Sequence, residues 1–265
     1  MNIIHRLSFN DKKIDSLFGE ICIKPKGGIV HYFDIGENDK KWPIVKKILM
    51  QNKTSIIDNQ YKTSFTKKEL SQSKNFVMEP MCHLLYPEPQ IDFGYEKTTY
   101  DSTQACSFCG QGMKRQDLFS IKKEPAWGNK DIIQLNWVFD EFFVTEKLKE
   151  LLMREFKVNF LPVKIFGKDA YCKNMFNLEI KSIVTIEDVS YLNFEKCPVC
   201  GKIKYAMCHN NYFPKISKMD SFIAWTAEYF GSGHSAFRQV IINRNLYDFF
   251  IQNNIKGVNF IPVAL

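Results

Sequence analysis

Cys106-Ser107-Phe108-Cys109-Gly110 is a short pattern that returns later in the chain as Cys197-Pro198-Val199-Cys200-Gly201. The Cys-x-x-Cys spacing lets two thiolates of one tight turn reach a single Zn2+ ion. A glycine straight after the second cysteine permits the positive φ that such a turn needs. Two half-sites complete one tetrahedral site, so the sequence predicts one Zn2+ per chain, bound by Cys106, Cys109, Cys197 and Cys200.

The predicted zinc site is structural rather than catalytic. Four thiolates take every coordination position of the ion and leave no place for a catalytic water. The segment 110–196 then becomes a loop that the metal closes, which helps to specify the fold. A further ligand pair, Cys208-His209, follows the second motif, so a site of three cysteines and one histidine, or a second site, stays open as an alternative.

The Cys-x-x-Cys motif has two other common uses, as a redox dithiol and as part of a disulfide framework. A redox dithiol normally occurs once, so the doubled pattern with trailing glycines favours zinc. Residues 1–8 lack the apolar core of a signal peptide, and we therefore expect a cytoplasmic protein with reduced thiols. The cysteines Cys22, Cys82 and Cys172 lie among apolar residues and are expected to be small buried hydrophobes.

The composition is that of a globular protein, with 45% hydrophobic, 14% aromatic and 25% charged residues. No run approaches the roughly 18 uninterrupted apolar residues of a membrane helix, so we expect no membrane partner. The net charge of +7 would suit an acidic partner or a phosphate backbone, yet the excess comes from dispersed lysines. Such a mixture of Lys and Glu favours a solvated surface over a nucleic-acid footprint.

An internal repeat accompanies the two cysteine motifs. Residues 143–163 resemble residues 241–263, and both segments end in Val-Asn-Phe-x-Pro-Val. In each copy a β-rich run leads to a cap residue, Thr145 or Asn243, and then to apolar positions at helical spacing. The pattern predicts strand, helix and strand. The proline of the last strand cannot donate to a ladder and argues for an edge position or a strand end.

The sequence therefore predicts an α/β (α+β) fold with duplicated strand-helix-strand units at about residues 100–165 and 190–265. Each unit would bring one cysteine motif, so the split zinc site would clasp a pseudo-symmetric pair around one core. Coincidental likeness of the two segments is the alternative. The units form the predicted domain 86–265, and an extended connector is expected at about 80–100, because the prolines of Tyr86-Pro87-Glu88-Pro89 cannot continue a helix.

Residues 1–85 are predicted to form a smaller N-terminal α/β portion. A strand is expected at 29–33, and Trp42–Met50 has the pattern of an amphipathic helix. Thr66 and Glu69 have the spacing of a capping box, which predicts the start of a further helix.

The polar residues show no enzyme signature. Gly231-Ser232-Gly233-His234-Ser235 matches neither a phosphate loop nor a nucleophile elbow, so a turn is expected. Asp140-Glu141 and Glu187-Asp188 are adjacent acids that point to different faces of a strand or helix and form no acid–base pair without tertiary help. The aromatic residues of 137–143 are expected to pack on both faces of a buried strand rather than to stack on bases. We therefore expect a protein that is not an enzyme.

The two cysteine motifs and the closing Gly257-Val258-Asn259-Phe260-Ile261-Pro262-Val263 resemble those of the double-CXXCG protein family, whose members include immunity proteins of bacterial polymorphic toxin systems. The resemblance covers roughly residues 86–265. It implies a small cytosolic protein that neutralises a cognate toxin by binding it, with no chemistry of its own. The basic balance would suit an acidic toxin surface.

Two other functions stay open from the sequence. Lys114-Arg115 after the first motif and Lys202-Ile203-Lys204-Tyr205 after the second would suit a zinc ribbon that binds nucleic acid, with salt-sensitive binding. A metalloenzyme centred on His234 or on Cys208-His209 would need an open metal position. The sequence does not fix the oligomeric state or the identity of a toxin.

Overall fold

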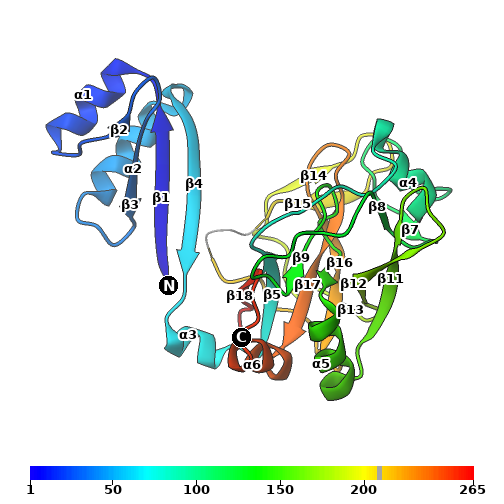
Figure 1. Ribbon diagram of the computed structural model, residues 1–265. Coiled ribbons are helices and arrows are strands. Elements are labelled where there is room, and N and C mark those ends of the chain that lie inside the picture. The colour runs from blue at the N-terminus through cyan, green and yellow to red at the C-terminus, as the bar shows by residue number, and fades with distance from the viewer. Residues whose placement is uncertain (208–210) are drawn as a thin grey trace. The chain divides into compact units, whose positions relative to one another are not determined.

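The computed structural model describes residues 1–207 and 211–265 (Figure 1). The chain divides into two compact units, residues 1–72 and residues 73–207 with 212–265. Both units combine helices with strands, so the fold class is α+β. No helix in the described ranges is long and apolar enough to cross a lipid bilayer.

The first unit is a four-stranded antiparallel sheet with helices packed on one face. Strand β1 (Asn2–Phe9) alternates along its length, so that Leu7 and Phe9 are fully buried on the same side. Helices α1 (Lys12–Glu20) and α2 (Trp42–Gln51) add Phe18 and Val45 to the same core. The remaining elements are β2 (Lys26–Gly27), β3 (His31–Gly36), the 3-10 helix η1 (Lys53–Ser55), β4 (Ile56–Ser64) and α3 (Lys67–Gln72), and the strand order is β2-β3-β1-β4.

Two predictions for this unit are confirmed. Helix α2 covers the expected amphipathic segment. Thr66 and Glu69 form the expected capping box at the start of α3. The Thr66 N–H donates to the Glu69 carboxylate at 2.8 Å, and the Glu69 N–H donates to Thr66 Oγ1 at 3.2 Å. Two N–H groups that the helix itself leaves unpaired are thus satisfied.

The border between the two units lies at 72/73 rather than at 85/86. Strand β5 (Asn75–Pro80) belongs to the second unit, where it lies between β17 (Phe237–Asn243) and β18 (Val258–Pro262). Both partners come from the end of the chain, so no local pattern marks this border. The expected extended connector is interrupted by η2 (Ile91–Phe93) and α4 (Gly94–Thr99).

The second unit holds two larger sheets and a two-stranded hairpin. The five-stranded sheet has the order β8 (Ser120–Ile121), β11 (Asn159–Ile165), β12 (Tyr171–Glu179), β10 (Phe143–Val144) and β9 (Ile132–Ile133). The seven-stranded sheet has the order β14 (Phe194–Lys196), β15 (Ile203–Tyr205), β16 (Ile223–Phe230), β17, β5 and β18, with β13 (Ile183–Val184) also paired to β16. The hairpin pairs β6 (Tyr100–Asp101) with β7 (Lys114–Arg115). Phe119, Ile121 and Phe143 are fully buried in one core cluster.

The two segments that resemble each other in sequence have similar local arrangements. In the first, α5 (Glu146–Phe156) links β10 to β11, and β12 lies antiparallel between the two strands. In the second, α6 (Arg244–Gln252) links β17 to β18, and β5 lies antiparallel between them. The middle strand β12 comes after the first segment in the sequence, whereas the middle strand β5 comes before the second segment. A duplication behind this likeness stays a prediction.

Both linking helices begin at the predicted cap residues. Thr145 Oγ1 accepts a hydrogen bond from the Leu148 N–H at 3.3 Å. Asn243 Oδ1 accepts one from the Leu246 N–H at 3.1 Å. Leu148 and Leu246 are themselves buried. Each cap therefore fixes the turn that carries the first core residue of its helix.

The two prolines of the repeated strand ends occupy different positions. Pro262 ends β18, which is the edge strand of its sheet, as predicted. Pro162 lies inside β11, next to a shift in register, and the pairing of β11 with β8 begins only at Lys164. Neither position requires the ladder hydrogen bond that proline cannot donate.

We expect Thr145→Ala to lower the free energy of unfolding by about 1 kcal/mol, because the Leu148 N–H loses its acceptor. Asn243→Ala should have an effect of similar size through Leu246. Urea unfolding followed by circular dichroism measures both changes. Thr145→Ser, which keeps the oxygen, is the control, and unchanged stability in Thr145→Ala would contradict the capping role.

Candidate metal centre

Each cysteine motif lies at the tip of a two-stranded hairpin. Strands β6 and β7 flank the first motif, with Tyr100 opposite Arg115. Strands β14 and β15 flank the second motif, with Phe194 opposite Tyr205. A short antiparallel ladder therefore fixes the backbone on both sides of each turn.

The two turns share one backbone geometry. In the first, the Gly110 N–H donates to the Cys106 carbonyl at 2.8 Å, and the Cys106 N–H donates to the Gln111 carbonyl at 2.9 Å. The equivalent hydrogen bonds of the second turn, to Cys197 and Lys202, are 3.0 and 2.8 Å long. Gly110 and Gly201 have φ values of 75° and 74°, which residues with a side chain rarely adopt. The glycine of the motif thus has the role that the sequence predicts.

The four sulfur atoms of the two motifs converge. They all lie within 4.8 Å of one another. Cys106 Sγ is 3.8 Å from Cys197 Sγ, and Cys109 Sγ is 3.7 Å from Cys200 Sγ. Four thiolates placed tetrahedrally at about 2.3 Å from one ion are about 3.8 Å apart. The structure therefore brings all four predicted ligands together in a cluster that can hold a metal ion.

Main-chain N–H groups lower the pKa of two of these thiols, whereas burial raises the pKa of a third. N–H groups of Cys109 and Phe108 point at the Cys106 sulfur and lower its pKa to about 6. N–H groups within the second turn likewise lower the pKa of Cys197. Burial raises the pKa of Cys109 to about 12. A metal cation would offset that penalty, because a coordinating thiol loses its proton outright.

The loop 231–235 is a turn, as predicted, and it is fixed to the first motif. The buried Lys204 Nζ donates to the main-chain carbonyls of Gly233, Ser235 and Cys109, the last two at 3.1 and 3.4 Å. His234 Nδ1 lies 3.1 Å from the Ser107 carbonyl oxygen. His234 is therefore held beside the cysteine cluster but is not a member of it.

The other cysteines differ in their surroundings. Cys172 is buried, as predicted, and Cys82 is half-buried against the same core cluster. The prediction is wrong for Cys22, which is exposed, because the chain turns there in a left-handed conformation directly after α1. The alternative ligand pair Cys208-His209 lies outside the described residues.

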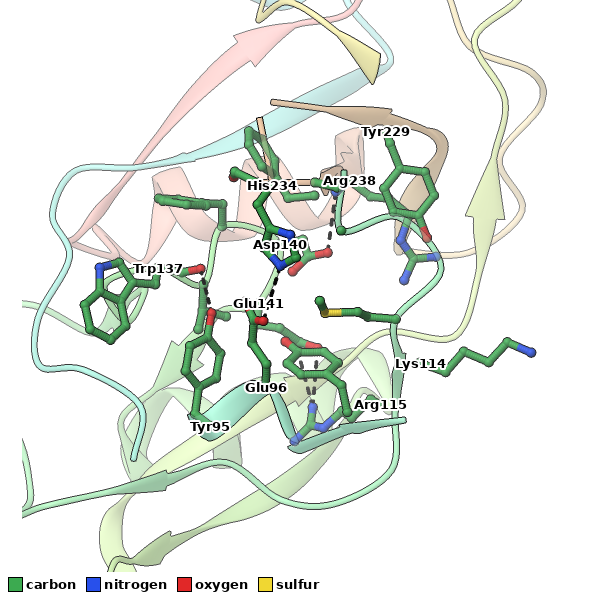
Figure 2. A pocket seen from close by; sticks show the side chains of 18 of the residues that line it. Tyr95, Glu96, Lys114, Arg115, Trp137, Asp140, Glu141, Tyr229, His234 and Arg238 are labelled. Carbon is green, nitrogen blue, oxygen red and sulfur yellow. Dashed lines mark hydrogen bonds and ion pairs between the residues drawn. The ribbon is translucent and has the colours of Figure 1, made fainter. Parts of the chain in front are cut away.

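A cavity of about 700 Å³ reaches Gly110 of the first cysteine motif. Figure 2 shows the side chains that line this cavity. Aromatic rings form much of its wall, including Tyr95, Tyr100, Trp137, Phe139, Trp225 and Tyr229. Charged side chains also face it, namely Glu96, Arg115, Asp140, Glu141 and Arg238. Nothing in the sequence motifs indicates this cavity, since its residues come from several separate loops and strands.

Asp140 and Glu141 both line this cavity, although adjacent acids were expected to point to different faces. The two side chains have different contacts: Glu141 lies against Arg115 and Asn177, and Asp140 lies against the Arg238 main chain. Neither acid lies in a regular strand, because the chain bends at Asp140 and strand β10 begins only at Phe143. The same irregular backbone divides the aromatic residues of 137–143. Trp137 and Phe139 face the cavity, whereas Phe142 and Phe143 are buried.

Burial is the main cause of the pKa shifts of Asp140 and Glu141. Burial raises the pKa of Glu141 to about 7, although the Arg115 guanidinium acts in the opposite direction. Burial also raises the pKa of Asp140. Arg115 Nη1 lies 3.5 Å from both Glu141 carboxylate oxygens and donates to Asn177 Oδ1. The cavity therefore combines desolvated charge with aromatic surface, as ligand sites in proteins do.

Two of the four basic residues that follow the cysteine motifs have partners within the protein. Lys204 is buried and bound to carbonyl groups. Arg115 is paired with Glu141 and Asn177. A phosphate backbone would need these charges to be exposed. Two of the residues that suggested nucleic-acid binding thus have structural roles.

No model of a known protein family matches the chain, and no curated protein matches it. The cysteine cluster and the cavity beside it are therefore the features from which a function is inferred.

Gly110 and Gly201 form a matched pair for substitution. Both need a positive φ, but a Cβ at Gly110 would lie 2.1 Å from the His234 carbonyl oxygen, whereas at Gly201 the nearest atom, on Lys196, is 3.9 Å away. We expect Gly201→Ala to cost about 1–2 kcal/mol of unfolding free energy through backbone strain alone. Gly110→Ala should cost more, because the loop 231–235 must move as well.

Urea unfolding of the two alanine variants gives the comparison directly. Equal losses of stability in Gly110→Ala and Gly201→Ala would contradict the close packing of the loop on the first motif.

Proposed function

We propose that the chain is a zinc-stabilised binding protein whose metal has a structural role. The observation that carries this proposal is the convergence of four thiols from two hairpins that lie far apart in the sequence. An all-thiolate, tetrahedral ligand set favours Zn2+ among the common cellular ions. One Zn2+ per chain would fill the cluster, and no coordination position would remain for a substrate or a catalytic water.

The same metal would clasp two related units, which is the finer part of the predicted fold. The similar arrangements around α5 and α6 support a duplication of the strand-helix-strand unit. In this proposal each unit contributes one cysteine hairpin, and the ion fixes one hairpin against the other. A clasp of this kind stabilises the fold because metal binding is linked to folding.

We further propose that the chain is an immunity protein that neutralises a cognate bacterial toxin by binding it in the cytoplasm. The support is the resemblance of the two cysteine motifs and of the closing segment 257–263 to the double-CXXCG family. A rigid, metal-clasped scaffold suits an inhibitor, since preorganisation lowers the entropic cost of binding. In this proposal the protein acts by covering the toxin and performs no chemistry.

Cys197→Ser should destabilise the fold rather than abolish a turnover. Cys197 is buried in the cluster, and its loss leaves three thiols and an incomplete site. We expect loss of bound zinc and a fall of several kcal/mol in unfolding free energy, since structural zinc binds with about 10–16 kcal/mol in small zinc peptides. Cys82→Ser, outside the cluster, is the control. Full stability of the metal-free Cys197→Ser protein would contradict the clasp.

The proposed immunity is tested by contact competition between bacteria. A strain that lacks this chain should be outcompeted by its parent on a solid surface, where contact-delivered toxins act. A plasmid copy of the wild-type chain or of Cys82→Ser should restore survival, and Cys197→Ser should not. Equal growth of the deletion strain and its parent in mixed culture would contradict the immunity function.

A further inference from the structure

We infer that the cavity beside the cysteine cluster binds an organic cation, an ammonium or guanidinium group on an apolar stem, through the carboxylates of Asp140 and Glu96 and the surrounding aromatic rings. This inference rests on the proposed function, because it names the chemistry that a binding protein of this fold would recognise. Three observations support it: the two carboxylates at the cavity, the contacts that already hold the Arg115 guanidinium, and the aromatic walls.

The Asp140 carboxylate faces the cavity and is sparsely hydrogen-bonded (Figure 2). Among the described residues no side chain donates to it, and the Arg238 main-chain N–H approaches one oxygen at only 3.4 Å. The residue is nevertheless held in place, because Trp225 Nε1 donates to the Asp140 carbonyl at 2.9 Å. A fixed, desolvated carboxylate with open acceptor positions favours a charged donor as its ligand.

Glu96 adds a second carboxylate at the wall of the cavity. It lies on α4, and its side chain is 24% exposed. His234 Nε2 is 3.4 Å from Glu96 Oε2, which is a long contact for a hydrogen bond (Figure 2). Glu96 and Asp140 thus approach the same space from separate elements. Glu96 contacts His234, and the charge of Arg238 acts on the Asp140 carboxylate.

Two of the basic side chains around the cavity already have contacts within its wall. Arg115 is bound to Asn177 and Glu141, and its guanidinium lies over the Phe119 ring, 4.8 Å from the centroid. The guanidinium of Arg238 lies over the Trp225 ring at 4.0 Å. Lys114 points away from the cavity (Figure 2). The Arg115 guanidinium is therefore poorly placed to receive an anionic ligand.

Two guanidinium nitrogens do lack partners, but a ligand in the cavity does not reach them. Arg115 Nη2 and Arg238 Nε have almost no solvent-accessible surface and no hydrogen-bond partner among the described residues. They are covered by protein rather than open to the cavity. The polar groups on the wall thus include the carboxylates of Asp140 and Glu96 as acceptors, beside the donor side chains of Tyr229, His234 and Ser235.

The aromatic walls suit the stem and the charge of such a ligand. Tyr95, Tyr100 and Trp137 line the cavity together with Trp225 and Tyr229, and the Arg238 guanidinium already lies over the last two rings. Aromatic faces attract cations and cover alkyl chains, so the rings would add to the attraction of the carboxylates. A cavity of about 700 Å³ is large enough for a butyl or longer stem with its cationic group.

The experiment is an isothermal titration of the zinc-loaded full chain with butylguanidinium. The neutral isostere butylurea and the anion butyrate serve as matched probes of charge. We expect saturable binding of butylguanidinium, with butylurea at least about tenfold weaker. Equal binding of butylurea, tighter binding of butyrate, or no binding of butylguanidinium at millimolar concentrations would overturn the inference.

Asp140→Asn keeps the shape of the side chain and removes its charge. We expect it to weaken butylguanidinium binding at least about tenfold. Asp169→Asn removes the same charge from the exposed turn between β11 and β12 and should bind as the wild type does. Circular dichroism and zinc content verify that each variant is folded, and Glu96→Gln provides a second test if Asp140→Asn does not fold. If the folded Asp140→Asn variant, or Glu96→Gln in its place, binds butylguanidinium as tightly as the wild type does, the inference is overturned.

N-acetyl-arginine amide distinguishes the two sources of the cation. If it binds as tightly as butylguanidinium, the cavity admits a basic side chain of a partner protein. If it is excluded while butylguanidinium binds, the ligand is a small free cation, and both results support the cation site. The titrations need no toxin, so a negative titration would contradict the cation site but not the proposed immunity function. A negative competition experiment would contradict the immunity function but not the cation site.

Discussion

The convergence of four thiols on one point is the constraint on which the second unit depends. Cys106 and Cys197 belong to different hairpins, yet their sulfur atoms lie 3.8 Å apart. Uncharged thiols gain little from such proximity, whereas thiolates around a cation gain a great deal. The buried Lys204 then ties the loop 231–235 to the first hairpin. In this way the first cysteine hairpin also places His234 at the cavity, beside Glu96.

The cavity and the cysteine cluster suit different roles in the second unit. The cluster has a closed ligand set and therefore suits a structural ion. The cavity has open acceptors and aromatic walls, which suit recognition. Gly110 belongs to both, because it forms part of the first cysteine turn and also lines the cavity. Occupation of the metal site would thus keep one wall of the cavity in place.

Local sequence patterns predicted several features of this protein correctly. They did not predict the features that depend on contacts between distant parts of the chain. Spacing alone identified the four cysteines that converge, and short side-chain patterns identified the caps Thr145 and Asn243. The place of β5 could not be predicted, because it pairs with strands from the end of the chain. The cavity escaped prediction because Asp140 lies in an irregular bend, where the alternation of strand residues does not apply.

The most direct test of the account is the metal content and ligand set of the natively purified chain. Elemental analysis should find one zinc per chain, and X-ray absorption at the zinc edge should find four sulfur ligands at about 2.3 Å. A protein that is folded and free of metal, or a zinc ion bound by nitrogen and oxygen ligands, would contradict the account.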